Sequence, residues 1–326
     1  MKKCLLSKST GLTVSRLGLG CMGMSWAYGS PDRAESIKTL QRALALGIDF
    51  LDTAEIYGPY TNEELLGEAL AGRREEVILA TKFGFNIEAG VINGANSHPK
   101  HIRRVLDESL KRLRTDYVDL YYQHRVDPKI PIEEVVGTVG ELVEKGKVRH
   151  VGLSEANSDT IKRAHATFPI AVLQSEYSLW ERGVEADILP TLRKLGIGFV
   201  PYSPLGRGFL TGAIKKFEDI PESDYRRTDP RYQGSNFAAN LKLVAVIEEI
   251  AKRNGATPAQ VALSWVLAQG EDMVPIPGTK RVKFLEENVE ALNLHLAASD
   301  MEELNGLSQS TAGPRYDERR MAMIQR

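Results

Sequence analysis

Four titratable side chains, Asp52, Tyr57, Lys82 and His124, stand at or just after the ends of three consecutive short apolar runs. A tyrosine hydroxyl has an ordinary pKa of about 10, but a nearby ammonium group such as that of Lys82 lowers this pKa. Asp52 is expected to pair with Lys82 and keep it charged, and His124 to donate a hydrogen bond to a substrate carbonyl. The set contains no nucleophile with an adjacent base, and it suits proton donation to a carbonyl oxygen.

Each of these residues alone has a simpler interpretation. An aspartate at a strand end often caps a helix or a turn, and a lysine there is usually solvated. Their occurrence at successive strand ends favours a shared site, because the C-terminal strand ends of a β/α barrel converge on one face.

The elements that would position them alternate regularly along the chain. Most of the β-rich runs are apolar without clean alternation, which is typical of strands buried on both faces. Helical spacing of apolar residues separates them, as in Ile102, Leu106 and Leu110. The eight expected strands are 17–21, 48–53, 77–82, 117–124, 148–154, 171–176, 197–203 and 273–277.

Eight such units predict one (β/α)8 TIM barrel over residues 1–326, with an open doubly wound sheet as the alternative. An N-terminal β-hairpin is expected within 2–15, and extra helices near the C-terminus. Two segments do not fit the repeat, a long loop at 206–236 and the tail at 308–326, and such loops are often functional lids or disordered.

Helix starts are marked by three local signals. Ser30-Pro31 predicts a cap followed by a proline at the first helical position. Thr61-x-x-Glu64 and Thr257-x-x-Gln260 predict capping boxes.

Composition excludes several classes of protein. With 26% charged residues and a net charge of -1, the chain gives no electrostatic reason to expect nucleic acid or an anionic membrane as a partner. Two cysteines make no disulfide framework, and His98 and His101 have a metal spacing without further ligands nearby, so no metal is expected. The chain has no apolar run long enough to span a bilayer or form a signal peptide, which favours a cytoplasmic enzyme.

The segment Gly18-Leu19-Gly20-Cys21-Met22-Gly23 matches the G-x-G-x-x-G pattern of a Rossmann phosphate loop. That loop requires a helix opening at the third glycine, whereas the next helical signal begins near Ser30-Pro31. The glycines are therefore interpreted as the exit of a first strand that other backbone or a ligand approaches closely.

Six ordered motifs between about residues 11 and 300 resemble the signature segments of the aldo-keto reductase superfamily, in the plant and microbial branch that includes pyridoxal and perakine reductases. They are DTAxxYG at 52–58, ATK at 80–82, DLYYQH at 119–124, VGLS at 151–154, PYSPLGRG at 201–208 and IPGTKR at 276–281.

The resemblance implies a catalytic tetrad of Asp52, Tyr57, Lys82 and His124 and an extended NADPH/NADP+ across the barrel mouth, without a Rossmann fold. Ser154 and Gln174 would hold the nicotinamide carboxamide, and Tyr202 would stack on its ring. The pyrophosphate would be bound by Ser203, Pro204, Leu205, Gly206 and Gly208, the 2'-phosphate by Gly278, Thr279, Lys280 and Arg281, and the adenine by Glu287 and Asn288. Gly23, Met24 and Asp52 complete the implied cofactor set. Two basic residues beside a Gly-Thr turn at a helix start suit a phosphate dianion.

Two positions depart from the family pattern. Glu155 stands where many members have asparagine after the serine of strand five, and it is expected to accept from the carboxamide without donating. Phe284 stands where many carry an arginine that packs on the adenosine. Substrate contacts are expected from Tyr57, His124, Trp26 and Arg125, with Trp180 and Tyr28 as further candidates for the pocket wall.

The expected activity is NADPH-dependent reduction of aldehydes or ketones to alcohols, acting on a small carbonyl substrate, as a monomer or a homo-oligomer. One alternative is an NADP-binding regulatory subunit of the channel β-subunit type with little turnover. Another is a barrel lyase or aldolase that uses Lys82 as a Schiff base, which an ion pair with Asp52 would oppose.

Overall fold

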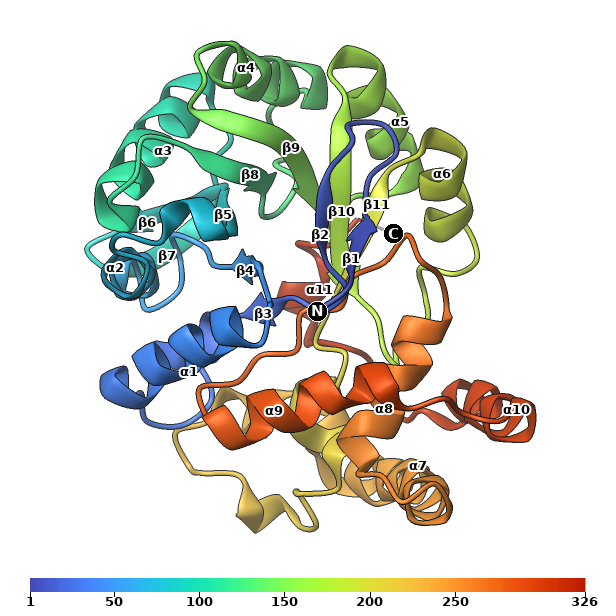
Figure 1. The fold of residues 1–326 in the computed structure, drawn as a ribbon. Coiled ribbons are helices and arrows are strands. Elements are labelled where there is room, and N and C mark those ends of the chain that lie inside the picture. The colour runs from blue at the N-terminus through green and yellow to red at the C-terminus, as the bar shows by residue number, and fades with distance from the viewer. Residues whose placement is uncertain (326) are drawn as a thin grey trace.

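The computed structural model describes residues 1–325, and its main feature is a parallel sheet that curls into a barrel ringed by helices (Figure 1). Seven strands lie in the order β11-β10-β9-β8-β5-β4-β3, and every neighbouring pair is parallel. Their bounds are β3 (Leu19–Gly20), β4 (Phe50–Asp52), β5 (Ile78–Phe83), β8 (Val118–Gln123), β9 (Val148–Ser154), β10 (Ile170–Glu176) and β11 (Gly198–Tyr202).

The eighth expected strand, 273–277, closes the barrel without forming a regular strand. The amides of Val274 and Ile276 donate to β11, and the carbonyls of Pro275 and Pro277 accept from Gly18 and Gly20 on the β3 side. Because proline has no N–H, this segment cannot complete the ladder toward β3. Isolated parallel bridges remain at its two ends, between Phe199 and Met273 and between Gly20 and Gly278. The fold is therefore the predicted (β/α)8 barrel, and the open sheet is excluded.

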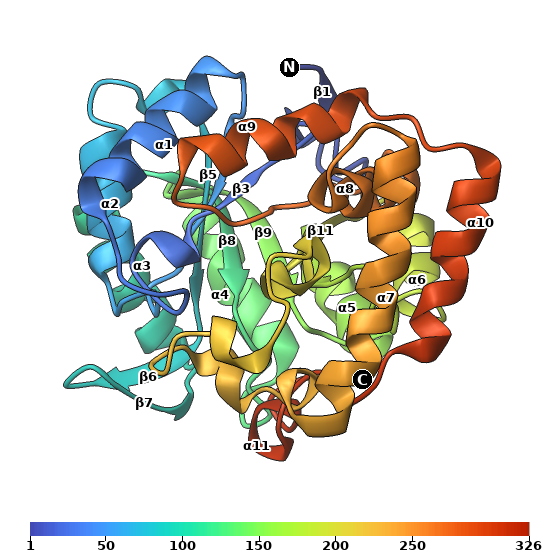
Figure 2. The same ribbon diagram turned by 90° about the horizontal axis from the view of Figure 1, so that it is seen from below.

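Helices follow the strands around the outside, and additional helices gather near the C-terminus as predicted (Figure 2). Ile102, Leu106 and Leu110 are buried along α3, as their spacing predicts. The helices are α1 (Arg33–Ala45), α2 (Thr61–Ala69), α3 (Pro99–Leu113), α4 (Ile132–Glu144), α5 (Ser158–Thr167), α6 (Ile188–Leu195), α7 (Gly234–Arg253), α8 (Pro258–Ala268), α9 (Val282–Glu290), α10 (Ala298–Gly306) and α11 (Glu318–Met321).

Two of the three predicted helix starts are wrong. The cap of α1 is Asp32, whose side chain accepts from the Glu35 amide, so Ser30-Pro31 lies outside the helix. Thr61 is already the first residue of α2, and its hydroxyl donates to the Gly58 carbonyl instead of capping. The capping box between Thr257 and Gln260 is present with both bonds.

The N-terminal hairpin of β1 (Lys3–Leu5) and β2 (Thr13–Ser15) is confirmed. It covers the end of the barrel where the strands begin, because Ser9 bonds Gly196 and Ile170 just before or at the start of β11 and β10. A second hairpin of β6 (Phe85–Glu88) and β7 (Val91–Ala95) was not expected from the sequence. It follows β5 at the opposite end of the barrel. Of the described helices, none is long and apolar enough to cross a membrane.

The first glycine-rich segment lies where other backbone approaches closely. A Cβ atom on Gly18 would come within 2.8 Å of Phe50 and Ile276, and one on Gly20 within 2.8 Å of the Ile276 carbonyl. A single 3-10 turn, Met22–Met24, follows in place of a phosphate-binding helix. The 206–236 loop contains further 3-10 turns, at Gly206–Thr211, Phe217–Asp219, Tyr225–Thr228 and Pro230–Tyr232.

Candidate active site

Lys82 is the centre of a buried hydrogen-bonded group at the C-terminal end of the strands. Its ammonium donates to Asp52 Oδ1 at 2.5 Å, to the backbone oxygen of Thr53 at 2.8 Å and to the Tyr57 hydroxyl at 3.2 Å. The other Asp52 oxygen accepts from Gln174 Nε2 at 2.8 Å. Lys82 is fully buried, whereas Tyr57 is 8% exposed, so Tyr57 is the more accessible of the two to a substrate.

Parallel register brings these residues together. Asp52 pairs with Ala80 across β4 and β5, and Lys82 pairs with Tyr122 across β5 and β8, two residues before His124. The amide of Glu55 still donates to the Lys82 carbonyl, at 3.4 Å, so the loop that carries Tyr57 stays attached to β5 beyond the end of β4. The four residues predicted from three consecutive strand ends therefore share one side of the barrel mouth.

His124 lies against Tyr57 and Phe85. Its ring centroid is 5.9 Å from that of Tyr57 and 5.1 Å from that of Phe85, both edge-on. Burial, together with the charges of Arg125 and Lys82, lowers the pKa of His124 well below its usual value. The imidazole is therefore neutral near pH 7, and a neutral imidazole has one N–H to donate.

Lys82 lowers the pKa of Tyr57 as expected, but the net shift of this pKa is upward. Burial raises the pKa of Tyr57 above its usual value of 10.0, and the opposing charge of Lys82 does not offset this because Asp52 also raises it. Burial alone would favour neutral Lys82, but Asp52 and Tyr57 outweigh it and raise the pKa of Lys82. Near neutral pH the Tyr57 hydroxyl keeps its proton and Lys82 keeps its charge.

The residues expected to bind a nicotinamide cofactor lie along the remaining strand ends. Ser154 ends β9, Gln174 lies in β10 and Tyr202 ends β11. Ser203, Pro204 and Leu205 lead into the 3-10 turn Gly206–Thr211, and Gly23 and Met24 lie in the turn after β3. Gly206 has φ +56°, and a Cβ there would come within 2.8 Å of the Trp180 ring. This loop therefore needs glycine at 206, because its backbone has a positive φ and packs directly on the Trp180 ring.

The expected 2'-phosphate residues follow the eighth strand position. Gly278 pairs with Gly20, and the Lys280 ammonium donates at 2.7 Å to the carbonyls of Tyr28 and Ser30. Arg281 is exposed at the start of α9. Burial lowers the pKa of Lys280 from its usual value, and the Arg281 charge adds to this. The expected adenine residues Glu287 and Asn288 lie on α9, and Thr279 accepts from the Arg281 amide.

Of the two departures from the family pattern, Glu155 is buried and bonded within the protein, whereas Phe284 is exposed. Glu155 has φ +56° and uses both carboxylate oxygens within the protein, accepting from the Glu176 amide at 3.1 Å and pairing with Arg315 at 2.7 Å. Phe284 is 43% exposed on α9, with the Arg281 guanidinium 6.0 Å from its ring centroid.

Of the residues expected to line the substrate pocket, some lie near the tetrad and others do not. Trp26 is 41% exposed and its ring centroid lies 6.4 Å from that of Tyr57. Arg125 directly follows His124 and donates to the Ser154 hydroxyl at 3.3 Å. Trp180 is 2% exposed and packs on Phe209, so its expected place in the pocket wall is wrong. The Tyr28 hydroxyl bonds that of Tyr225 at 3.0 Å and so joins the first loop to the 206–236 loop.

A second group of side chains at the mouth was missed from the sequence. Arg207 pairs with Glu176 at 2.6 Å and lies over the ring of Tyr316, whose hydroxyl bonds that of Tyr202 at 3.0 Å. Arg315 donates to the Tyr202 hydroxyl at 3.3 Å. Tyr316 and Arg315 belong to the C-terminal tail, and no local signal in the sequence marks a tail residue as part of the mouth.

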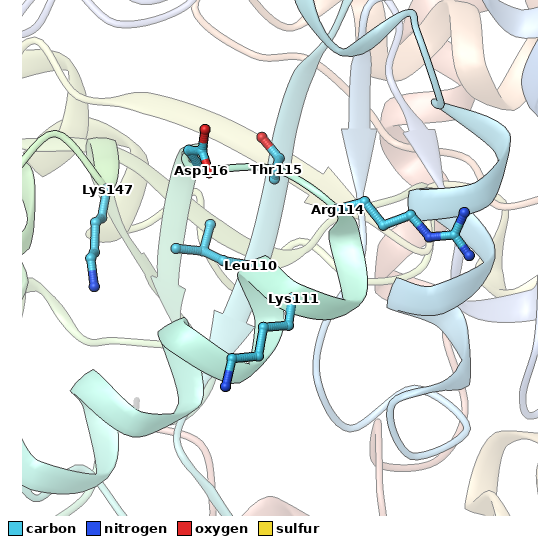
Figure 3. Close-up of a pocket in the computed structure, with 6 residues that line it drawn as sticks. All are labelled: Leu110, Lys111, Arg114, Thr115, Asp116 and Lys147. Atoms are coloured by element: carbon cyan, nitrogen blue, oxygen red, sulfur yellow. The ribbon is translucent and has the colours of Figure 1, made fainter.

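A surface hollow of about 510 Å³ lies elsewhere (Figure 3). It is at the end of α3 and the starts of β8 and β9, which is the end of the barrel opposite the C-terminal strand ends. Active sites of such barrels lie at the C-terminal end, so this hollow is separate from the tetrad. Its lining residues are Leu110, Lys111, Arg114, Thr115, Asp116 and Lys147.

Known proteins resemble both the sequence and the fold. The model of the aldo/keto reductase family matches residues 16–309. A probable aldo-keto reductase 1 from Glycine max is 48% identical over 296 residues, which is 90% of this chain and 85% of that protein.

Three solved structures share the barrel. A glycerol dehydrogenase from Gluconobacter oxydans has a TM-score of 0.86 at 28% identity, covering 97% of this chain and 98% of its own. A thermostable aldo-keto reductase in complex with the inhibitor epalrestat has a TM-score of 0.76 at 32% identity, covering 94% and 100%. An aldo-keto reductase from Bacillus halodurans in its holo form has a TM-score of 0.78 at 27% identity, covering 98% and 99%. With the family model matching most of its length, this chain belongs to the aldo/keto reductase family, whose members are oxidoreductases acting on carbonyls.

Proposed function

We propose that this protein is an NADPH-dependent reductase of aldehydes or ketones in which Tyr57 is the general acid. The observation that carries the proposal is the position of the Lys82 ammonium, which bonds Asp52 and the Tyr57 hydroxyl together in a buried group. Near neutral pH this arrangement holds a protonated hydroxyl beside a fixed positive charge, and a carbonyl oxygen that gains negative charge needs both.

Each residue has a separate task in the proposed reaction. When bound, NADPH supplies the hydride for the carbonyl carbon. His124 donates a hydrogen bond that orients the carbonyl oxygen, and Tyr57 transfers its proton to that oxygen. Lys82 stabilises the phenolate that remains, and Asp52, held by Gln174, fixes Lys82 in place.

For the cofactor, we propose the residues along the strand ends together with the 278–281 turn. The chemistry of the donor set fits a dinucleotide phosphate: a glycine-dependent turn at Gly206, then Lys280 and Arg281 at the start of a helix. Lys280→Ala is expected to weaken NADPH binding about tenfold more than NADH binding, because it removes one charge-assisted bond to the 2'-phosphate. Equal weakening of both cofactors would place Lys280 outside the 2'-phosphate site.

The direct test follows NADPH consumption with a panel of aldehydes, ketones and pyridoxal, with Tyr57→Phe in parallel. The variant is expected to lose about 10²- to 10⁴-fold in turnover while keeping its affinity for NADPH. Loss of cofactor binding in Tyr57→Phe would indicate a structural role for this residue. Tight NADPH binding without turnover of any carbonyl would contradict the proposal and favour the regulatory-subunit alternative.

A further inference from the structure

Arg125 is a charged residue at the mouth that the proposed mechanism does not use. It follows His124 directly, and its Nη1 donates to the His124 carbonyl at 2.6 Å and to the Ser154 hydroxyl at 3.3 Å. The side chain is partly buried. Its charge helps to lower the pKa of His124 and opposes the rise in the pKa of Tyr57, so the guanidinium lies close enough to act on the reacting groups.

Five other arginines near the mouth have carboxylate partners. Arg207 pairs with Glu176, and Arg315 pairs with Glu155. Arg226, Arg231 and Arg320 are likewise paired, with Asp224, Glu181 and Asp229. Within residues 1–325, by contrast, no carboxylate oxygen lies within 4.0 Å of the Arg125 guanidinium.

The carboxylate that acts on Arg125 already has other partners. Tyr202 and, after it, Glu155 raise the pKa of Arg125, but the two oxygens of Glu155 bond Arg315 and the Glu176 amide. Arg315 itself is also near enough to repel Arg125. Within residues 1–325 the hydrogen bonds of the Arg125 guanidinium both run through Nη1, to the His124 carbonyl and the Ser154 hydroxyl, so its other N–H groups are available to an anion.

Around Tyr57 and His124 the other neighbours are mainly apolar. Trp26 lies by Tyr57 and Phe85 lies by His124. Ala54 and Ile56 form a cluster with Tyr57 and Phe85, against which Ile87 and Ile92 pack. A substrate bound here meets a hydrocarbon surface and a single unpaired cation.

We propose that Arg125 binds a carboxylate of the substrate, so that the preferred substrates are aldehydes or ketones with an apolar body and a carboxylate group. This inference rests on the proposed carbonyl reduction. A guanidinium presents two parallel N–H groups that match a carboxylate, which gives both affinity and orientation. The bond from Arg125 to the His124 carbonyl fixes the guanidinium relative to the residue that orients the reacting carbonyl.

The test compares the three formylbenzoate isomers with their uncharged methyl esters. The quantity measured is the ratio of kcat/KM for each acid to that for its ester, in which a general loss of activity cancels. For the isomer that best spans the two sites the ratio is expected to be about tenfold to a hundredfold above one, as a charge-assisted hydrogen bond provides. In Arg125→Met the ratio should fall to near or below one, mainly through KM of the acid, and Arg125→Lys should restore part of it.

Arg320→Met is the matched control, because it removes a positive charge from the same mouth at a residue paired with Asp229. It should leave the acid-to-ester ratio within about twofold of the wild-type value, since exposed or paired charges act weakly at a distance. An equal fall in Arg320→Met and Arg125→Met would overturn the proposal in favour of a diffuse electrostatic effect. An unchanged ratio in Arg125→Met would overturn it as well.

These measurements distinguish failure of the carboxylate site from failure of the proposed reductase function. Turnover of the esters without preference for any acid rejects the carboxylate site and leaves the reductase proposal standing. If no carbonyl is turned over, calorimetric binding of the same acids and esters to the NADP+-loaded protein gives the ratio without catalysis. Equal binding of acid and ester, unchanged in Arg125→Met, would then reject the site.

Discussion

The carboxylate of Glu155, at the end of β9, lies 2.7 Å from the guanidinium of Arg315 in the C-terminal tail. Both side chains are buried, with exposures of 4% and 6%. Arg315 also donates to the hydroxyl of Tyr202 at the end of β11. The ion pair thus fastens the tail over the strand ends, beside the residue expected to stack on the nicotinamide.

Replacing Arg315 by methionine is expected to release the tail while the barrel stays folded. Removing one partner of a buried ion pair costs about 3–5 kcal/mol, because it leaves the other charge uncompensated. The tail can avoid this cost by detaching, which exposes Glu155 to water. Limited trypsin digestion should then cut at Arg319 and Arg320 much faster than in the wild type, and the Kd for the cofactor should rise.

A double-mutant cycle with Glu155→Gln separates the pair from other effects of the tail. Because the double variant removes both charges of this ion pair, it should be more resistant to trypsin than Arg315→Met alone. Additive effects of the two substitutions would show that the ion pair does not hold the tail.

The sequence predicts the barrel and the tetrad because both depend on local patterns. Each of the four tetrad residues lies at or just after an apolar run, so alternation along the chain is enough to bring them to one end of the barrel. The eighth strand is recognisable as a run, but Pro275 and Pro277 reduce it to two bridges. The direction of the Tyr57 pKa depends on a balance between burial and the charges of Lys82 and Asp52, and no spacing in the sequence gives that balance.

Local sequence patterns do not predict contacts between segments that are far apart in the chain. Glu155 is visible in the sequence as a departure from the family asparagine, yet its partner Arg315 lies 160 positions further on. Before α1 both Ser30 and Asp32 are residues that can cap a helix, and the cap is Asp32. Before α2 the N-cap position is Tyr60, which makes no side-chain cap bond, so a pattern of capping residues does not locate this helix start.

Lys82→Met is expected to destabilise the protein, in contrast to Tyr57→Phe. Asp52 is 1% exposed, and the lysine substitution removes the cation from its buried carboxylate, at a cost of about 3–5 kcal/mol in the free energy of unfolding. Tyr57→Phe removes a hydroxyl at a more accessible position, with an expected cost of about 1 kcal/mol. Thermal unfolding of the two variants measures the difference. Equal changes in Tm would mean that the buried Asp52 carboxylate is not stabilised by the Lys82 ammonium.

A second substitution, Asp52→Asn, is expected to restore part of the stability that Lys82→Met loses. Adding Asp52→Asn removes the unpaired carboxylate, so the double variant should have a higher Tm than Lys82→Met while remaining inactive. A double variant as unstable as Lys82→Met would point to lost packing instead.

The pH profile should report the raised pKa of Tyr57. Reduction requires the protonated hydroxyl, so kcat/KM for reduction should stay level through mildly alkaline pH, since the pKa of this group lies above its usual 10.0. Alcohol oxidation requires the deprotonated form and should accelerate as pH rises over the same range. Steady-state rates in both directions test this, and a fall in reduction near pH 7 would identify a different acid.

Glu55→Gln is expected to remove a pH dependence of stability that arises from a buried carboxyl. Burial, with the charge of Glu63, raises the pKa of Glu55 from 4.5 to about 8, although the backbone amides of Phe85 and Gly84 bond it. Between these pH values the native carboxyl holds a proton that the unfolded chain has released. The native state therefore binds more protons, and its stability falls as pH rises from about 4.5 to 8, by at most about 1.4 kcal/mol per pH unit.

Urea unfolding of the wild type and Glu55→Gln at a series of pH values measures this contribution as a difference, in which the other titrating groups cancel. The variant should gain stability relative to the wild type steadily from pH 4.5 to 8 and by a constant amount above pH 8. Glu64→Gln is the matched control, because Glu64 is exposed on α2 nearby, and it should give a flat difference. If the stability difference between Glu55→Gln and the wild type also does not change with pH, Glu55 is ionised in the native state over the whole pH range. Its carboxylate would then be stabilised by the amides of Gly84 and Phe85.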